Sequence, residues 1–362
     1  MSGKPNPDIR EVTREEIEQF FLQHGEKKFR AGQVYDWLWK KNCHSFSGMT
    51  SLPLDSRRLL QEHFSFRTAT VETRQESSDG TVKTGFRLSD GLLVEGVLIP
   101  SGRRATGCIS SQVGCALGCK FCATGQLGFA RNLTAGEIFD QVTGIALSAG
   151  APREGGEQDN PVTKACTQIS NLVFMGMGEP LLNYENVKAA IDRITSPDSL
   201  GMSPQRITLS SVGIPKMIMK MADDQPRYHF ALSLHAATDE KRNRIIPFNL
   251  KHPLQDVAEA LKYYHRKTGK RFTVEYILFG NFNDSADDAK ALSQFCRSFP
   301  VKINIIEYNP VKDTGFTRSS PERTMAFVKF LESRNMVVNV RASRGKDIDA
   351  ACGQLAGKHM KL

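Results

Sequence analysis

Three cysteines stand close together in the sequence, at Cys115, Cys119 and Cys122, with the spacing C-x3-C-x2-C. Thiolates at this spacing are soft ligands that bind zinc or an iron–sulfur cluster. A structural zinc site takes four protein ligands, usually in paired C-x2-C units, and no fourth cysteine or histidine follows nearby. Three cysteines on a four-iron cluster leave one iron open to a small molecule. The loop therefore favours an open iron–sulfur cluster over a zinc site.

Size and composition restrict the class of protein. The 362 residues suffice for one large domain and a smaller one. No apolar run reaches about 18 residues and the first residues contain no apolar signal core, so we expect a cytoplasmic protein without a membrane span. In a reducing compartment the eight cysteines are expected as thiols or metal ligands.

The charge of the chain favours a polyanionic partner. The formal net charge is +9, and nine lysines and arginines fall within residues 241–271. An enzyme that is merely basic would show the same net charge, so charge alone leaves both readings open.

The first 66 residues read as a small helical domain. Thr13 and Glu16 form a capping-box pattern ahead of an apolar helix face, and another helix is expected at 56–64. In the helix expected between them, Trp37 and Trp39 stand among several lysines and arginines. This pattern suits either core packing or a module that binds RNA phosphates.

The remaining chain changes from strand alternation to repeated strand–helix units. Residues 67–100 alternate polar and apolar side chains around two Asp-Gly turns, which predicts a short antiparallel β linker. Parallel strands are then predicted at 106–111, 169–175, 206–210, 229–234, 272–278 and 302–308. Helices are predicted at 135–149, 184–194, 214–221, 254–267, 286–299 and 321–334. We therefore predict an α/β fold, a partial (βα)6 barrel of the TIM-like kind. The polar segment 150–166 reads as a surface insertion.

Polar or glycine-rich motifs follow five of the predicted strands, where the chemistry of such barrels gathers. They are the cysteine loop, GMGEP, SSVG, SLH and EYNP. Glu179 in GMGEP could pair with an ammonium group, and Ser210, Ser233 and Asn309 could bond a carboxylate or a ribose. A ligand that also chelates an open iron and carries adenosine is S-adenosylmethionine (SAM). Taken alone, Glu179 could equally be a solvated turn residue.

Two cysteines outside the loop are candidates for chemistry. Cys108 lies in the first predicted parallel strand, and Cys352 lies in the glycine-flanked segment RGKDIDAACGQL near the end of the chain. A lone cysteine is usually a small buried hydrophobe. That role is expected for Cys43, Cys166 and Cys296. The glycines around Cys352 instead indicate a loop that presents a thiol.

Several motifs together resemble the radical SAM adenosine-C2 RNA methyltransferases of the RlmN type. They are CALGCKFC, GMGEPLLN, SLH, EYNP and SRGKDIDAACGQL. The likeness covers essentially the whole chain, including FRAGQVYDWLWKK and LLVEGVLIP. Many radical SAM enzymes share the three-cysteine motif, whereas the C-terminal segment is much more specific.

The resemblance implies a role for each matching residue. Cys115, Cys119 and Cys122 match the ligands of a 4Fe–4S cluster. SAM contacts match Gly178, Glu179, Ser210, Ser233, Leu234, His235 and Asn309. Cys352 matches the cysteine that is methylated, Cys108 the thiol that closes a transient disulfide with it, and Glu95 the proton acceptor.

The resemblance also implies the reaction, methylation of carbon 2 of adenosine with two SAM molecules per turnover. Carbon 2 is an electron-poor amidine carbon, so it is not a nucleophile towards the SAM methyl group. In the family's route one SAM methylates Cys352, and the second yields a radical that activates this methyl group for addition to carbon 2. Glu95 then removes the carbon-2 proton. Cys108 attacks the sulfur of Cys352, which leaves a disulfide to be reduced.

The implied substrates are an adenosine in the peptidyl-transferase region of 23S rRNA and the adenosine next to the anticodon of tRNA. Both bases would be splayed out for reaction. A flavodoxin-like electron donor and a monomeric protein are expected. The expected domains are an RNA-binding helical domain at 1–66, a small β element at 67–100, the barrel core at 101–345 and the methyl-carrier segment at 346–362.

Two rival readings use the same cysteines. The sister enzymes that methylate carbon 8 of adenosine and confer antibiotic resistance share these site residues, although the N-terminal helix sequence and DIDAACGQL favour carbon 2. A non-catalytic, zinc-bearing RNA-binding protein would use the thiols of the cysteine loop only as structural ligands.

Overall fold

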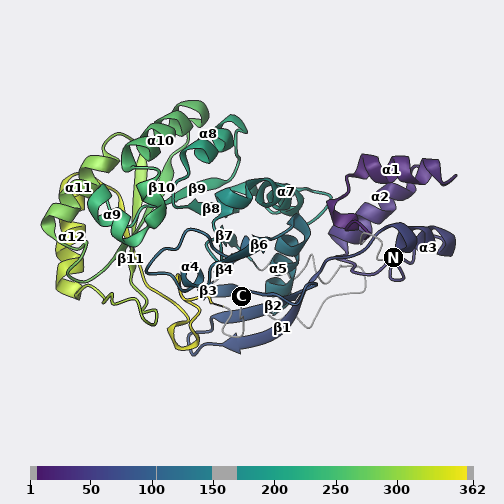
Figure 1. The fold of residues 1–362 in the computed structure, drawn as a ribbon, viewed down its shortest axis with the longest axis horizontal. Coiled ribbons are helices and arrows are strands. Elements are labelled where there is room, and N and C mark those ends of the chain that lie inside the picture. The colour runs from purple at the N-terminus through teal and green to yellow at the C-terminus, as the bar shows by residue number, and fades with distance from the viewer. Residues whose placement is uncertain (1–5, 103, 149–168, 357–362) are drawn as a thin grey trace.

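A ten-stranded sheet runs through the computed structural model, which describes residues 6–102, 104–148 and 169–356. The strand order is β1-β2-β3-β4-β7-β8-β9-β10-β11-β12. Pairing is antiparallel from β1 to β4 and parallel from β4 to β12. Figure 1 shows helices around the outside of the curved sheet and the N-terminal helices set to one side of it. The predicted α/β barrel fold is confirmed.

Six of the parallel strands lie within three residues of their predicted ends. The parallel strands are β4 (Arg104–Cys108), β7 (Asn171–Phe174), β8 (Ile207–Ser211), β9 (His229–Ser233), β10 (Phe272–Leu278), β11 (Val301–Glu307) and β12 (Val338–Arg341). The sequence pattern does not predict β12. Its four residues lie at the sheet edge, none of them is fully buried, and so they lack a continuous apolar run.

The antiparallel strands are β1 (Ala69–Glu76), β2 (Val82–Leu88) and β3 (Leu93–Ser101). Because β3 pairs with β4, these strands extend the barrel sheet itself. The β linker predicted from the sequence is therefore continuous with the barrel in hydrogen bonding.

The helices that follow the parallel strands each bury one apolar face against the sheet. They are α5 (Ala135–Ser148), α7 (Tyr184–Thr195), α8 (Pro215–Asp223), α10 (Leu254–Thr268), α11 (Ala286–Cys296) and α12 (Pro321–Ser333), joined by the short α9 (Asp239–Ile245). The predicted insertion 150–166, with Cys166, lies outside the described residues. Among the described helices, none is both long and apolar enough to cross a membrane.

The N-terminal region forms α1 (Arg14–Gln23), α2 (Arg30–Tyr35) and α3 (Leu54–His63). The predicted capping box is present, since Thr13 Oγ1 accepts from the Glu16 N–H at 3.2 Å and Glu16 Oε2 accepts from the Thr13 N–H at 2.7 Å. Trp39 is buried and meets the Phe139 ring of α5 edge-on at 5.2 Å. Trp39 is therefore a core residue.

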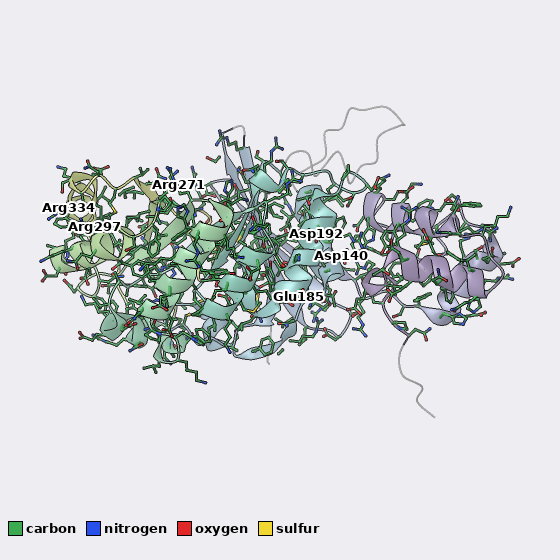
Figure 2. All side chains as sticks on the ribbon, turned by 90° about the horizontal axis from the view of Figure 1, so that it is seen from above. Asp140, Glu185, Asp192, Arg271, Arg297 and Arg334 are labelled. Atoms are coloured by element: carbon green, nitrogen blue, oxygen red, sulfur yellow. The ribbon has the colours of Figure 1, made fainter. Side chains whose placement is uncertain are left out.

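A buried charged cluster joins the N-terminal helices to the barrel. Asp140 of α5 accepts hydrogen bonds from Arg10 Nη1 at 2.8 Å, from His44 Nε2 at 3.0 Å and from the Ala69 N–H at 2.8 Å. Figure 2 shows Asp140 on the side of the barrel that faces these helices. Burial opposes its ionisation, but Arg10 and His44 outweigh burial and lower the pKa of Asp140. The ion pair therefore fixes how the two parts meet.

Replacement of Asp140 should destabilise the protein strongly. Asp140→Ala removes the carboxylate that bonds the buried Arg10 guanidinium at 2.8 Å and leaves it with Asp8 at 3.9 Å, so we expect the free energy of unfolding to fall by about 3–5 kcal/mol in urea denaturation. Asp198→Ala is the control, because the Asp198 side chain is 82% exposed and its ion pair lies at the surface. A loss below about 1 kcal/mol for Asp140→Ala, the range of exposed pairs, would contradict this account.

Candidate active site

A cavity lies at the carboxyl ends of the parallel strands and collects most of the predicted site residues. Its walls come from the cysteine loop, from the ends of β7, β8, β9 and β10, and from the C-terminal segment. The predicted residues that line it are Cys115, Cys119, Cys122, Gly178, Glu179, Ser210, Ser233, His235 and Cys352. The fold thus brings Cys352 to the cysteine loop across more than two hundred residues of sequence.

The cysteine loop lies between β5 (Gln112–Gly114) and α4 (Ala123–Gln126). Cys115 and Cys119 are buried and pack with apolar neighbours that include Phe121. Burial raises the pKa of the loop thiols, that of Cys115 to about 12, and the charges of neighbouring cysteines add to this effect. Three desolvated thiols on one loop match the donor chemistry of an iron–sulfur cluster, whose positive irons would favour the thiolate forms.

A site for a single metal ion, such as zinc, would require at least three side-chain ligands that converge on one point. Across the described parts of the chain, no three Cys, His, Asp or Glu side chains converge as ligands of one ion. The fit to a cluster therefore rests on the chemistry and burial of the three thiols.

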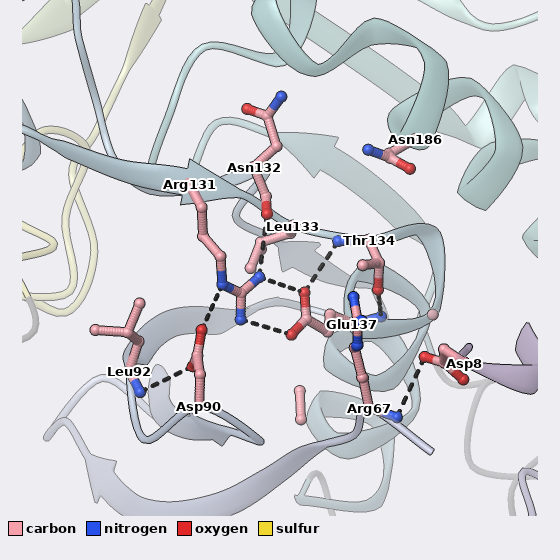
Figure 3. Close-up of polar contacts among 12 residues, drawn as sticks. Asp8, Arg67, Asp90, Leu92, Arg131, Asn132, Leu133, Thr134, Glu137 and Asn186 are labelled. Carbon is pink, nitrogen blue, oxygen red and sulfur yellow. Dashed lines mark hydrogen bonds and ion pairs between the residues drawn. The ribbon is translucent and has the colours of Figure 1, made fainter. Parts of the chain in front are cut away.

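Arg131 holds the chain that leaves the cysteine loop. It lies in β6 (Phe129–Asn132), which pairs with β5. Its guanidinium donates from Nε to Asp90 at 2.5 Å and bonds both oxygens of Glu137 at 2.8 Å (Figure 3). Asp90 belongs to the turn between β2 and β3, and Glu137 to α5. A bidentate pair of this kind fixes geometry as well as charge.

Glu179 is held by backbone amides at the end of β7. Its two carboxylate oxygens accept from the Val212 N–H and the Leu181 N–H, each at 3.0 Å. Gly178 before it has φ +96°, and a Cβ there would lie 2.5 Å from Gln112 Cβ, so only glycine fits. Burial raises the pKa of Glu179 to about 6 despite these bonds. A cationic group beside the carboxylate would offset this cost.

Ser210 and Ser233 lie side by side on neighbouring strands, with their hydroxyl oxygens 3.0 Å apart. His235 follows them and accepts the Ile277 N–H at Nδ1, 3.2 Å away. Burial, with the charge of Arg242, lowers the pKa of His235 to about 3. The ring is therefore neutral at physiological pH, with its proton on Nε2 available to donate.

Arg242 is one of the nine lysines and arginines within residues 241–271. Unlike an exposed basic residue, it is buried at the rim of the site. Its guanidinium donates to the backbone carbonyls of Leu234 and Val212 and to the Asn249 side chain. Burial lowers its pKa to about 10, so it stays charged. Arg242 therefore ties the loops after β8 and β9 together and does not belong to the exposed charges available to a polyanionic partner.

Leu234 and Asn309 do not line the cavity, although the resemblance implies SAM contacts for both. Leu234 is buried, and its N–H donates to the Glu275 carbonyl at 3.0 Å. Asn309 is 3% exposed, and within the described residues its Oδ1 has no hydrogen-bond partner. A buried amide oxygen without a partner is costly and suits a donor supplied by a ligand.

Cys352 lines the cavity, whereas Cys108 lies outside the lining but near enough for the charge of Cys352 to act on it. Cys352 is solvent-accessible but recessed, and Cys108 is buried at the end of β4, opposite Val97 and Val173. Burial raises the pKa of Cys108, and the nearby Cys352 charge raises it further. The two thiols are therefore close enough to interact electrostatically.

Glu95 lies on the same face of the sheet as Cys108, since it precedes Val97 by two residues in β3. Lys83 Nζ lies 3.6 Å from its carboxylate, and the Ala356 N–H donates to the other oxygen at 3.0 Å. Glu95 is thus outside the cavity lining but joined directly to the C-terminal segment.

One carboxylate inside the barrel is not predicted from the sequence. Glu275 of β10 lines the cavity, accepts from Asn304 Nδ2 at 2.8 Å and pairs with Arg341 at 3.4 Å. Burial raises the pKa of Glu275, and Arg341 opposes this shift. The available signal was a lone glutamate inside the apolar strand FTVEYIL.

The whole fold is similar to a solved structure. The crystal structure of a radical SAM methyltransferase from Sphaerobacter thermophilus superposes with a TM-score of 0.87 at 35% identity, over 97% of this chain and 99% of that one. The barrel and its cysteine-lined cavity therefore define an enzyme of the radical SAM methyltransferase class.

Proteins with similar sequences show which family of radical SAM methyltransferases the chain belongs to. The family described as ribosomal RNA large subunit methyltransferase N-terminal domain matches residues 7–65. A probable dual-specificity RNA methyltransferase RlmN of Flavobacterium johnsoniae is 50% identical over 98% of both chains. The dual-specificity RNA methyltransferase RlmN of Anaeromyxobacter sp. is 41% identical over 98% of this chain and 92% of its own. The chain belongs to the RlmN family of RNA methyltransferases, as the sequence motifs predict.

The neutral His235 should make stability depend on pH. Because its folded pKa of about 3 lies below the ordinary 6.5, the unfolded chain binds more protons between these values, and stability falls as pH falls. Between pH 7 and 5 the wild type should lose about 2 kcal/mol more than His235→Gln. Urea unfolding at both pH values measures this difference. His229→Gln, an exposed position on β9, is the control, and equal losses in wild type and His235→Gln would contradict the prediction.

Proposed function

We propose that this protein is a SAM-dependent radical methyltransferase that modifies carbon 2 of adenosine in 23S rRNA and tRNA. The observation that carries the proposal is that Cys352 and the three-cysteine loop line one cavity. Carbon 2 of adenine does not attack a SAM methyl group, so its methylation needs an intermediate carrier of the methyl. A thiol beside a radical-generating site is suited to that role. The relatives described as dual-specificity RNA methyltransferases support RNA as the substrate.

Cys115, Cys119 and Cys122 would hold the 4Fe–4S cluster. Cys115 and Cys119 are buried among apolar side chains and Cys122 is partly buried, which would limit the access of water to the thiolates and to a radical formed nearby. When bound, the cluster supplies the electron that begins the radical chemistry. A flavodoxin-like protein is the proposed source of that electron.

The rim residues would bind SAM. Glu179 would be the partner for its ammonium group, since no cation among the described residues forms an ion pair with its buried carboxylate. The paired hydroxyls of Ser210 and Ser233 and the Nε2–H of His235 would bond its carboxylate or ribose. The unpaired Oδ1 of Asn309 would accept from the adenosine end, and Gly178 and Leu234 would contribute backbone contacts.

Cys352, Cys108 and Glu95 would act on the RNA base. Cys352 carries the methyl group, and its recessed yet accessible thiol lets both SAM and an unstacked adenine approach. Glu95 accepts the carbon-2 proton of the linked base. Cys108 would then attack the sulfur of Cys352: the S–S bond forms, the S–C bond to RNA breaks, the released carbon takes a proton to become the methyl group, and the one electron left over returns to the electron donor. An external reductant would reopen the disulfide.

The RNA backbone would be held by basic surfaces. We assign this role to the helical domain 1–66 and to the exposed cations of α10, which include Lys262, Arg266 and Lys267. The other proposed domains are the small β element 67–100, the barrel core 101–345 and the carrier segment 346–362. We propose that the protein acts as a monomer. Arg271, Arg297 and Arg334 lie at the end of the molecule away from the N-terminal helices (Figure 2).

The RNA product tests the reaction and the carrier. RNA treated anaerobically with the protein, SAM and a reductant should yield 2-methyladenosine on digestion and mass spectrometry. Cys352→Ala should make no methylated adenosine but should still cleave SAM to 5′-deoxyadenosine, because the cysteine loop and rim are unchanged. Appearance of 8-methyladenosine without 2-methyladenosine would overturn the assignment to carbon 2. Normal methylation by Cys352→Ala would overturn the carrier role.

Metal analysis tests the role of the loop. Anaerobically purified protein should be brown and contain about four irons per chain, the content of a 4Fe–4S cluster. Cys119→Ala should lose most of this iron and its absorbance, whereas Cys296→Ala, at a buried thiol in the core, should keep both. A colourless protein with one zinc per chain would contradict the proposal.

A further inference from the structure

The segment that carries Cys352 is fastened at both ends, and we call residues 345–356 the strap. Its base meets the turn between β1 and β2, and its far end meets the residues that follow the cysteine loop. Cys352 lies between these anchorages in the cavity wall. The position of the thiol therefore depends on both ends of the strap.

At the base, the strap and the turn between β1 and β2 each contribute a carboxylate that accepts hydrogen bonds from the other segment. Asp347 of the strap accepts from Ser77 Oγ at 2.5 Å and from the Ser78 N–H at 3.0 Å. In return, Asp79 of the turn accepts from the Gly345 N–H at 3.0 Å. Such charge-assisted bonds are shorter and stronger than neutral ones. The two carboxylates thus clamp the strap to the turn from both sides.

The backbone at the base is closely packed as well. Gly345 has φ +65°, and a Cβ there would lie 2.8 Å from both Thr81 Cγ2 and Ala350 Cβ. The Ala350 N–H donates to the Gly345 carbonyl at 2.9 Å, which closes a tight turn. The base is therefore a compact unit built outside the cavity.

The far end uses groups of the reacting site instead. The Ala123 N–H, next to Cys122, donates to the Gly353 carbonyl at 2.7 Å, and the Ala356 N–H donates to Glu95 at 3.0 Å. Glu95 is the proposed proton acceptor. A protonated carboxyl group accepts hydrogen bonds less strongly than a carboxylate, so this bond weakens once Glu95 has taken the proton.

The Thr124 hydroxyl also donates to the Leu355 carbonyl at 2.5 Å, and Gln354 Nε2 donates to the Pro310 carbonyl at 3.0 Å. The far end therefore loses one of its bonds during the reaction, whereas the base keeps all of its own.

We propose that Asp79 and Asp347 are positioning residues, which fix the base of the strap and so hold Cys352 in place while its partners change. This inference rests on the proposed function, in which the Cys352 sulfur meets SAM, the RNA base and Cys108 in turn. The antiparallel strands would then have two roles, since they carry Glu95 and also anchor the base of the strap. Loss of the clamp uncouples radical formation from methylation, because the first depends on the cysteine loop and the second on the thiol's position.

The test compares Asp347→Ala, the milder Asp347→Asn and the control Asp287→Ala, an exposed aspartate on α11. In protein without a cluster, hydrogen exchange of the strap amides should be faster in Asp347→Ala and unchanged in Asp287→Ala. In the loaded enzyme, Asp347→Ala should form 5′-deoxyadenosine at the wild-type rate. Its ratio of 2-methyladenosine to 5′-deoxyadenosine should fall roughly tenfold or more, as expected for a misplaced reacting group.

A double variant that exchanges the hydroxyl and the carboxylate of the clamp distinguishes a loss of strap positioning from a loss of overall stability. Ser77→Asp combined with Asp347→Ser rebuilds one hydroxyl–carboxylate bond across the same contact, so it should recover much of the lost ratio. Unchanged strap exchange in Asp347→Ala, or equal losses of 5′-deoxyadenosine and product without rescue, would overturn the proposal. If the wild type methylates no adenosine, the proposed function fails, and hydrogen exchange still decides whether the clamp holds the strap.

Discussion

The pairing of β3 with β4 is the constraint on which the site depends. This register sets Cys108 opposite Val97 and so places Glu95 on the same face of the sheet. It also brings the turn between β1 and β2 within reach of the C-terminal strap. Without that antiparallel extension the barrel would retain its cysteine loop, but it would lose Glu95 and the turn to which the C-terminal strap is bonded.

Burial sets the electrostatics of the cavity. It raises the pKa of the loop thiols and of Glu179, and it lowers that of His235. Each shift disfavours a charge that a ligand of opposite sign would restore, or keeps a ring neutral so that it can donate a hydrogen bond. Burial lowers the pKa of Arg242 as well, but only to about 10, so its guanidinium stays charged and donates to three acceptors. The cavity is thus suited to a ligand that brings a cationic group to Glu179 and a hydrogen-bond acceptor to His235.

Regular elements could be predicted from the sequence because their signals are local. Strand β10 is an apolar run interrupted only by Thr273 and Glu275, and α1 begins with a capping box, so neither requires knowledge of distant residues. The meeting of the strand-end motifs could be predicted because parallel strands present their carboxyl ends on one rim of a barrel. The family motifs supplied the roles of Cys352, Cys108 and Glu95.

Long-range contacts could not be predicted, because they depend on the three-dimensional approach of distant segments. Arg242 reads as a surface base in a basic stretch, yet it is buried against carbonyls of two other loops. The clamp between Asp347 and Ser77 joins residues that are 270 apart in the chain. Glu275 looks like an irregularity in a core strand until the barrel closes around the cavity. In each case composition gave the residue type but not its partner.

The central claim is that Cys352 links RNA to the protein and that Cys108 releases it. Mass spectrometry of the Cys352 peptide from Cys108→Ala, after reaction with SAM, a reductant and RNA, tests this claim most directly. The account predicts an adenosine joined to Cys352 through one carbon, in RNA that stays attached to the protein. Free methylated RNA at the wild-type rate, with Cys352 unmodified, would contradict it.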